Sequence, residues 1–143
     1  WLREPDDVNE IVPLPGADKD PFAGEIGSSE DRAYLQLGYA FNDFSVTWQT
    51  TYIGPADLDD QFLSGYDLAP GSVGIGSWLY HDLQASYNAW DTVQFYLGVN
   101  NVFDKDPPPI ISGLPFDVTG TETDAGTYDA IGRRYYGGFR MKF

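Results

Sequence analysis

The last ten residues of this chain alternate between apolar and polar side chains. Counting back from the C-terminus, Phe143, Met141 and Phe139 are apolar, and the residues between them are Lys142 and Arg140. A period of two places the apolar side chains on one face of a β-strand and the charged side chains on the other. A strand of about 10 residues with a tilt of about 45° is long enough to cross the hydrocarbon core of a bilayer. This pattern therefore predicts an amphipathic strand that can span a membrane.

The same alternation recurs in four other segments. Together with the C-terminal strand, the expected strands are 33–39, 44–52, 79–87, 93–100 and 134–143. One face of each carries mainly aliphatic and aromatic side chains, and the other carries mainly amides, hydroxyls and small residues. None of these segments has the repeat of about 3.6 residues that is typical of an amphipathic helix. The chain is therefore expected to be all-β.

Short and long connections alternate between these strands. Residues 41–44 and 88–92 are short turns, whereas 54–74 and 104–127 are long and rich in Gly, Pro and Asp. Outer-membrane barrels sort their connections in this way, with short turns on the periplasmic side and longer loops outside. A soluble sandwich has no physical reason to do so. The expected fold is therefore an antiparallel transmembrane β-barrel.

Five strands are too few to close such a barrel. The smallest membrane barrels have about 8 strands, and each unpaired backbone group at a sheet edge in lipid costs several kcal/mol. The chain is therefore expected to be the C-terminal piece of a larger barrel, which supplies the other strands. On this interpretation, residues 30–143 form the last five strands, and residues 1–29 form an outer loop or the tail of a preceding strand.

Acidic residues dominate the charge. The formal net charge is −14, and most acids lie in residues 1–31 or in the two long connections. This balance argues against nucleic acid as a partner. Solubility explains acidic loops, and divalent-cation binding is the alternative, with Asp57, Asp59 and Asp60 as the best cluster. That cluster lacks the spacing and the closing Glu of a calcium loop, so neither a metal nor a cofactor is expected.

The sequence shows no pattern that is typical of a catalytic site. His81 is the only histidine, and its neighbour Asp82 belongs to the opposite face of the same strand. An activated nucleophile needs a base that a third group holds in place. The chain also has no cysteine. It is therefore not expected to be an enzyme.

Three segments resemble the end of TonB-dependent outer-membrane receptors. Residues 98–108, GVNNVFDKDPP, match the pattern G-x-x-N-(L/V)-F-(D/N)-x-x-P near the end of those receptors. Residues 128–143, YDAIGRRYYGGFRMKF, resemble their terminal strand, and residues 81–87, HDLQASY, resemble the strand two before it. The order and spacing of the three segments match those of the receptors, and the resemblance covers about residues 30–143.

This resemblance implies that the chain forms the last five strands of a barrel of about 22 strands. In such receptors, a plug domain and a short segment that contacts TonB belong to the N-terminal part, which would precede this chain. The resemblance also implies a location in the outer membrane and the import of a scarce nutrient, such as a ferric siderophore, a vitamin, haem or an oligosaccharide, with energy delivered through TonB. The implied partners are the rest of the barrel, its plug, TonB, outer-membrane lipid and the barrel-assembly machinery.

Counting back from the C-terminus also assigns side chains to the lumen of the barrel. The polar positions that are expected to face the lumen and contact a ligand or the plug are Asp82, Gln84, Gln94, Tyr96, Asn100, Arg134, Tyr136, Arg140 and Lys142. Solvation in a water-filled lumen explains the same residues equally well. By resemblance, the terminal aromatic Phe143 is expected to be the signal for the barrel-assembly machinery, and a place in the membrane-facing girdle is the alternative.

Two other interpretations fit the composition. A secreted β-sandwich that binds carbohydrate would also be acidic, rich in aromatic residues and free of cysteine. Its apolar faces would have to meet in a dry core instead of facing lipid. A small barrel that closes by oligomerisation is the third interpretation. The position of the apolar faces therefore distinguishes the sandwich from a membrane protein.

Overall fold

The computed structural model describes residues 2–3, 10–11, 20–21, 23–110 and 123–142. These residues form one large antiparallel β-sheet, two small strand pairs and one short helix. The all-β, antiparallel fold that the alternation predicts is therefore confirmed. The two outermost strands of the large sheet do not pair with each other. The structure thus shows an open sheet and not a closed barrel.

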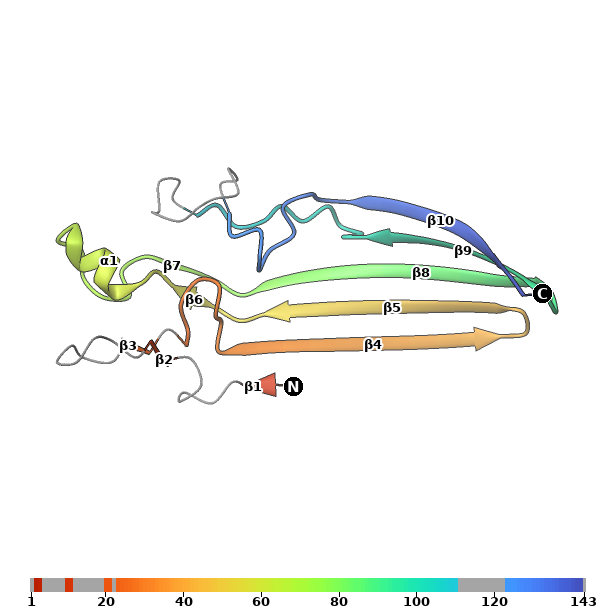
Figure 1. Ribbon diagram of the computed structural model, residues 1–143, viewed down its shortest axis with the longest axis horizontal. Coiled ribbons are helices and arrows are strands. Elements are labelled where there is room, and N and C mark those ends of the chain that lie inside the picture. The colour runs from red at the N-terminus through yellow and green to blue at the C-terminus, as the bar shows by residue number, and fades with distance from the viewer. Residues whose placement is uncertain (1, 4–9, 12–19, 22, 111–122, 143) are drawn as a thin grey trace.

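Five long strands make up most of the large sheet (Figure 1). They are β4 (Asp31–Phe41), β5 (Phe44–Ile53), β8 (Trp78–Trp90), β9 (Val93–Asn100) and β10 (Arg134–Met141). Each pairs antiparallel with the next in this order. All five predicted strands are present, and β4 and β8 extend beyond the predicted segments at both ends. A sixth strand, β1 (Leu2–Arg3), pairs with the first two residues of β4 along its outer edge.

Two-residue turns join the strands at one end of the sheet, which we call the turn end. Asn42 and Asp43 connect β4 to β5, and Asp91 and Thr92 connect β8 to β9. Asn42 has a φ of 51°, a left-handed conformation that Asn adopts more readily than most residues. The described parts of the long connections lie at the opposite end, the loop end (Figure 1). Short and long connections are therefore separated by end, as their alternating lengths predict.

The remaining elements are short. Strand β2 (Glu10–Ile11) pairs with β3 (Asp20–Pro21), and β6 (Ala56–Asp57) pairs with β7 (Gly74–Ile75).

Helix α1 (Asp60–Gly65) lies between β6 and β7, and the periodicity of the sequence does not predict it. The Asp59 carboxylate caps this helix by accepting a hydrogen bond from Phe62 N at 2.6 Å. A local cap, and not an amphipathic repeat, therefore marks where α1 begins. No helix in the described part of the chain is long and apolar enough to cross a membrane.

The pairing register aligns the apolar positions of all five long strands. One row across the sheet, in which each residue pairs with the next, consists of Leu37, Trp48, Leu83, Val99 and Tyr135. The adjacent row, whose side chains point the other way, consists of Gly38, Thr47, Gln84, Gly98 and Tyr136. Because side chains alternate along a strand, this register keeps every apolar stripe on the same side. The sheet therefore has a largely apolar face and a polar face.

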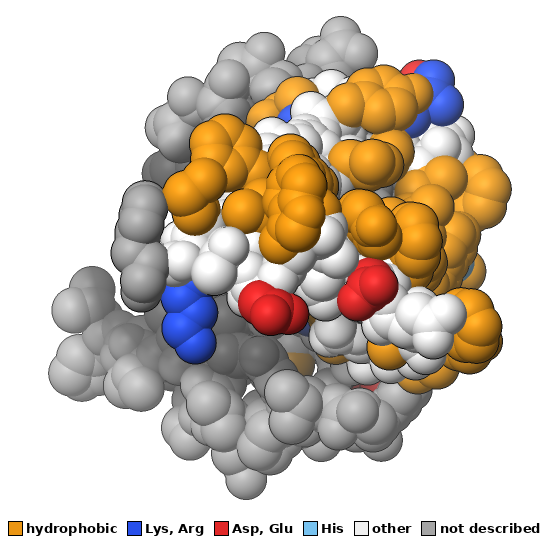
Figure 2. All heavy atoms as spheres, turned by 90° about the vertical axis from the view of Figure 1, so that its right-hand side faces the viewer, with side chains coloured by type: hydrophobic (Ala, Val, Ile, Leu, Met, Phe, Trp, Pro, Cys, Tyr) orange, Lys and Arg blue, Asp and Glu red, His pale blue; other side chains and the backbone are white. Residues whose placement is uncertain are grey.

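The buried core lies at the loop end and not beneath the sheet. Its main cluster consists of Ile53, Tyr80 and Tyr128. On the apolar face, by contrast, Leu97 is 64% exposed and Tyr135 is 73% exposed. Figure 2, which looks along the strands from the turn end, shows hydrophobic side chains gathered along one side of the molecule. Within the described residues, the apolar face therefore has no cover.

Candidate functional site

The apolar face presents aliphatic and aromatic side chains from every long strand. Among its exposed members are Leu37, Val46, Tyr87, Leu97 and Phe139. Near the turn end, the ring centroids of Phe44 and Tyr87 are 4.5 Å apart, which adds an aromatic pair to this face. A contiguous exposed apolar surface marks contact with lipid or with another protein. The first candidate functional surface is therefore the apolar face itself.

The polar face gathers the nine side chains that the sequence assigns to a lumen. Eight of them belong to β8, β9 and β10, and Lys142 follows directly after β10. Hydrogen bonds join the strands on this face: Tyr136 OH donates to Gln84 Oε1 at 3.3 Å, and Arg140 Nη1 donates to Gln94 Oε1 at 3.5 Å. The structure thus brings the predicted residues together on one surface, opposite the apolar face.

Two tyrosines of the polar face cover glycines of the neighbouring strand. Tyr136 pairs with Gly98, and Tyr96 pairs with Gly138. A Cβ atom added at Gly98 would overlap the Tyr136 ring, and one added at Gly138 would lie 2.7 Å from Tyr96 OH. The absence of a Cβ therefore gives each ring the space to lie across the adjacent strand. The alternation of the sequence does not reveal these pairs, because they depend on the register.

Asn101 reverses the chain where β9 ends. This residue is buried and has a φ of 53°. Its backbone N donates to Asp82 Oδ1 at 2.8 Å, its Nδ2 donates to the Lys105 carbonyl at 2.9 Å, and its Oδ1 accepts from Lys105 N at 2.8 Å. Asn is suited to this place because its short side chain bonds the nearby backbone and tolerates the left-handed conformation. Asn101, the Asn of the pattern in residues 98–108, therefore stabilises a turn.

Residues 98–108 and 128–143, the two longer segments that resemble TonB-dependent receptors, contact each other. Asp104 accepts hydrogen bonds from Arg133 N at 3.0 Å and from Arg133 Nη2 at 3.3 Å. Asp129 accepts a hydrogen bond from Arg134 Nη1 at 2.7 Å. We call these four residues together with Asn101 the loop-end clasp. The clasp joins the two ends of the long connection between β9 and β10, across a separation of 29 residues.

The end of this connection folds over the polar face. Residues 125–131 line a hollow of about 450 Å³ together with Thr51, Asp82, Asn100 and Arg134, among others. Tyr128 is buried beside the hollow, with its ring centroid 6.4 Å from that of Trp78. Burial raises the pKa of the Tyr128 phenol, and the negative charge of Asp124 raises it further. The packing of the loop end therefore favours the neutral phenol.

A polar trio interrupts the apolar face near the loop end. Trp48 Nε1 donates to Thr50 Oγ1 at 3.0 Å, and Thr50 Oγ1 lies 2.9 Å from His81 Nδ1. The Phe103 ring packs edge-on against His81, with 5.3 Å between ring centroids. Asp82, the neighbour of His81 in the sequence, lies on the polar face. The trio therefore provides hydrogen-bond partners for polar atoms on an otherwise apolar surface.

The three candidate metal ligands do not form a common site. Asp59 caps α1, and Asp60 Oδ1 accepts a hydrogen bond from Gly71 N at 3.1 Å. Asp57 lies in β6, where it pairs with Gly74. Within the described ranges, no group of three or more His, Cys, Asp or Glu side chains is placed to hold a metal ion. Hydrogen bonds to the backbone therefore account for two of these three carboxylates.

Phe143, which the sequence predicts to be the assembly signal, lies outside the described residues. No protein-family model, curated protein or solved structure matches this chain. The features that bear on function are therefore the two faces of the sheet, the clasp, and residues 98–108 and 128–143, which form the clasp.

Proposed function

We propose that this chain is the C-terminal part of the wall of a TonB-dependent outer-membrane transporter. In this proposal, the apolar face contacts acyl chains, and the polar face lines the water-filled interior of a barrel of about 22 strands. The observation that carries the proposal is the register, which keeps the apolar positions of five paired strands on a single exposed side. Agreement of this kind across neighbouring strands is what a wall between lipid and water requires.

The exposed apolar face needs a cover. Burying one large apolar side chain contributes about 1.5–3 kcal/mol, so about ten such side chains that are roughly half exposed represent on the order of 10 kcal/mol. This is comparable with the whole stability of an ordinary domain, about 5–15 kcal/mol. Acyl chains would supply the cover along the entire face. The alternative, a secreted carbohydrate-binding sandwich, needs a second sheet there, and no described strand takes that place.

The edges of the sheet need neighbours as well. Within the described residues, β10 pairs only with β9, and β4 is paired along its outer edge only at its first two residues. In hydrocarbon, each unpaired backbone group costs several kcal/mol. We therefore propose that further strands of the same barrel cover both edges.

The transport role follows from the receptor resemblance. In this proposal, the short turns face the periplasm, the long loops face the exterior, and a plug domain and TonB act with the complete transporter. The cargo is a scarce nutrient, such as a ferric siderophore, a vitamin, haem or an oligosaccharide. A strain that lacks TonB should lose uptake by the complete transporter. Unchanged uptake in that strain would favour passive diffusion instead.

Tryptophan quenching by brominated lipid tests the assignment of the faces. Trp48 lies on the apolar face, whereas Trp78 packs against Tyr128 at the loop end. In the complete transporter, with all tryptophans but one replaced by Phe, Trp48 should lose most of its fluorescence in vesicles of brominated lipid, and Trp78 should lose little. Flotation of the vesicles reports whether the chain has bound to them. Equal quenching of the two tryptophans would contradict the proposed orientation.

The assembly role of Phe143 is tested in the complete transporter. Deleting this residue should slow insertion into the outer membrane, because a terminal aromatic is the proposed signal for the barrel-assembly machinery. Pulse-chase labelling followed by surface proteolysis measures the rate. Insertion at the normal rate would leave Phe143 as a girdle residue only.

A further inference from the structure

Basic side chains are scarce in this protein, and most of those that the structure describes are engaged within the chain. The sequence has 8 Lys and Arg against 22 Asp and Glu. The engaged residues, which contact a carbonyl, an aromatic ring or carboxylates, are Arg32, Lys105, Arg133 and Arg134. Arg140 and Lys142 are less engaged: Arg140 donates only to the neutral amide oxygen of Gln94, at 3.5 Å, and no described carboxylate forms an ion pair with either residue. Two cations in a strongly acidic protein are therefore available to an outside partner.

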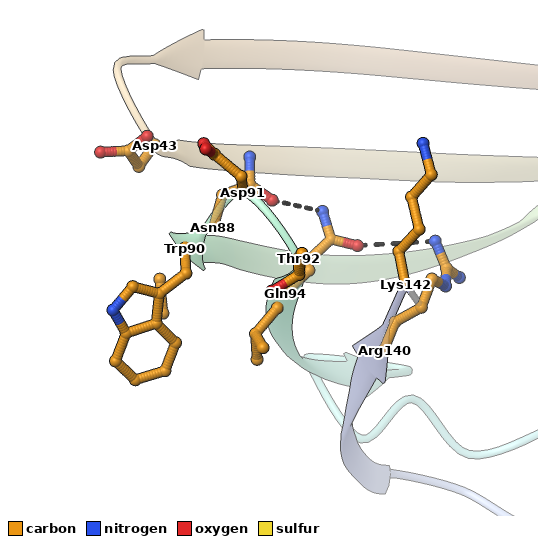
Figure 3. A pocket seen from close by; sticks show the side chains of 10 residues that line it. Asp43, Asn88, Trp90, Asp91, Thr92, Gln94, Arg140 and Lys142 are labelled. Atoms are coloured by element: carbon orange, nitrogen blue, oxygen red, sulfur yellow. Dashed lines mark hydrogen bonds between the residues drawn. The ribbon is translucent and has the colours of Figure 1, made fainter.

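Both cations line a hollow at the turn end of the polar face (Figure 3). The hollow has a volume of about 600 Å³. Gln94 Nε2 donates to Asn88 Oδ1 at 2.9 Å, and Gln94 Oε1 accepts from Arg140 Nη1 at 3.5 Å. These two hydrogen bonds link β8, β9 and β10 and orient the Arg140 guanidinium. In Figure 3, Arg140 and Lys142 lie on one side of the hollow, and the carboxylates of Asp43 and Asp91 lie on the other.

The arrangement fits a peptide better than a small anion. Residues two apart on a strand are separated by about 7 Å and point to the same face, so the spacing of Arg140 and Lys142 equals that of alternate residues in an extended peptide. An acidic peptide has carboxylates that can pair with the two cations. It also has backbone N–H groups that can donate hydrogen bonds to Asp43 and Asp91. A phosphate ion concentrates its negative charge in one group and has no backbone N–H groups to donate to the same two acids.

We propose that this hollow binds an extended acidic polypeptide segment, with two carboxylates one residue apart lying against Arg140 and Lys142. Charge favours approach from the turn end, because the described acidic residues of the long connections, such as Asp57, Asp60 and Asp124, lie at the opposite end of the sheet. The inference depends on the proposed function in one respect only: in a transporter, the hollow would open on the periplasmic mouth of the interior. The residues that form the hollow are the same in either setting.

Zero-length cross-linking tests the proposal. The whole chain, folded in nonionic detergent micelles, is mixed with the peptide Gly-Glu-Gly-Glu-Gly-Glu-Gly and a carbodiimide, which joins a peptide carboxylate to a neighbouring lysine amine. Mass spectrometry distinguishes the three lysines of the chain, Lys19, Lys105 and Lys142. We expect the cross-link chiefly at Lys142. Equal labelling of all three lysines would overturn the proposal.

Substitutions test the role of each cation. Fluorescence anisotropy of a labelled peptide should show a loss of affinity of about two- to fivefold for Arg140→Gln or Lys142→Gln, and of about tenfold for both together, as expected for exposed ion pairs. Arg140→Lys keeps the charge and should keep most of the affinity. Lys105→Gln removes an equal charge at the loop end and should change nothing. Unchanged affinity in the double variant would refute the proposal.

Two further measurements separate the possible failures. Inorganic phosphate at matched ionic strength should not displace the peptide. Displacement would show that the hollow binds phosphate and would overturn the peptide proposal. Flotation of the complete transporter with lipid vesicles reports membrane insertion independently of peptide binding. If cross-linking at Lys142 persists while the complete transporter fails to float, the membrane proposal is wrong and the peptide site stands. If the complete transporter floats but Lys142 is not labelled selectively, only the peptide site is wrong.

Discussion

Replacing Leu97 with Arg should destabilise the complete transporter in a membrane by about 2–4 kcal/mol. Leu97 lies near the middle of β9, pairs with Ala85 and Gly137, and is 64% exposed on the apolar face. If acyl chains surround Leu97, the substitution removes about two-thirds of the free energy that burying a leucine side chain contributes, or about 1–2 kcal/mol. Placing a guanidinium in hydrocarbon accounts for the rest, and snorkelling toward the interface limits this cost.

Gln84→Arg is the matched control for this substitution. Gln84 precedes Ala85, the direct partner of Leu97, so it lies at nearly the same depth but on the polar face. Its replacement removes one hydrogen bond, from Tyr136 OH at 3.3 Å, which contributes about 0.5–1.5 kcal/mol. Urea titration of both variants of the complete transporter in lipid vesicles, followed by tryptophan fluorescence, measures the free energies of unfolding. An equal or larger cost at Gln84 would refute the assignment of the faces.

Three other perturbations test the interior and the loop end. Gly98→Val should cost about 1–3 kcal/mol by overpacking against Tyr136, and Tyr136→Ala should relieve most of that cost in the double variant; additive costs would contradict the contact. Arg133→Ala should make the connection between β9 and β10 a few times more sensitive to limited proteolysis, as expected from losing a surface ion pair, while the strands stay protected. The pKa of Tyr128 is raised from 10.0, so the packed loop end is most stable below pH 10 and should loosen as the pH rises through the raised pKa. Trp78 fluorescence reports this transition. Tyr128→Phe should weaken it without abolishing it, because Tyr80 in the same cluster also carries a phenol.

The strands could be predicted because their signal is local. The side chains of β9 and β10 alternate between apolar and polar, and a period of two follows from backbone geometry without any distant contact. The turn at Asn42 and Asp43 is also local, since it depends on residues that tolerate turn conformations. Helix α1 was missed because it has only six residues and begins at a cap, which leaves no amphipathic repeat to detect.

The candidate site was predictable only in part. The alternation of side chains assigns Gln94 and Arg140 to one face, and the structure places them there within hydrogen-bonding distance. The partners of these residues could not be assigned in the same way. Asp104 and Arg133 are 29 residues apart along the chain, and Tyr136 covers Gly98 only because the register brings the two strands together in this way.

The sequence alone is enough to predict strands with one apolar and one polar face, because side-chain alternation is a property of each strand. The structure adds three features: the pairing that aligns the apolar positions of the five strands, the contact of Asp104 with Arg133 across the last long connection, and the buried core at the loop end. These features depend on contacts between residues far apart in the chain. Their free energy is gained only when the whole sheet has formed, so no single segment records them.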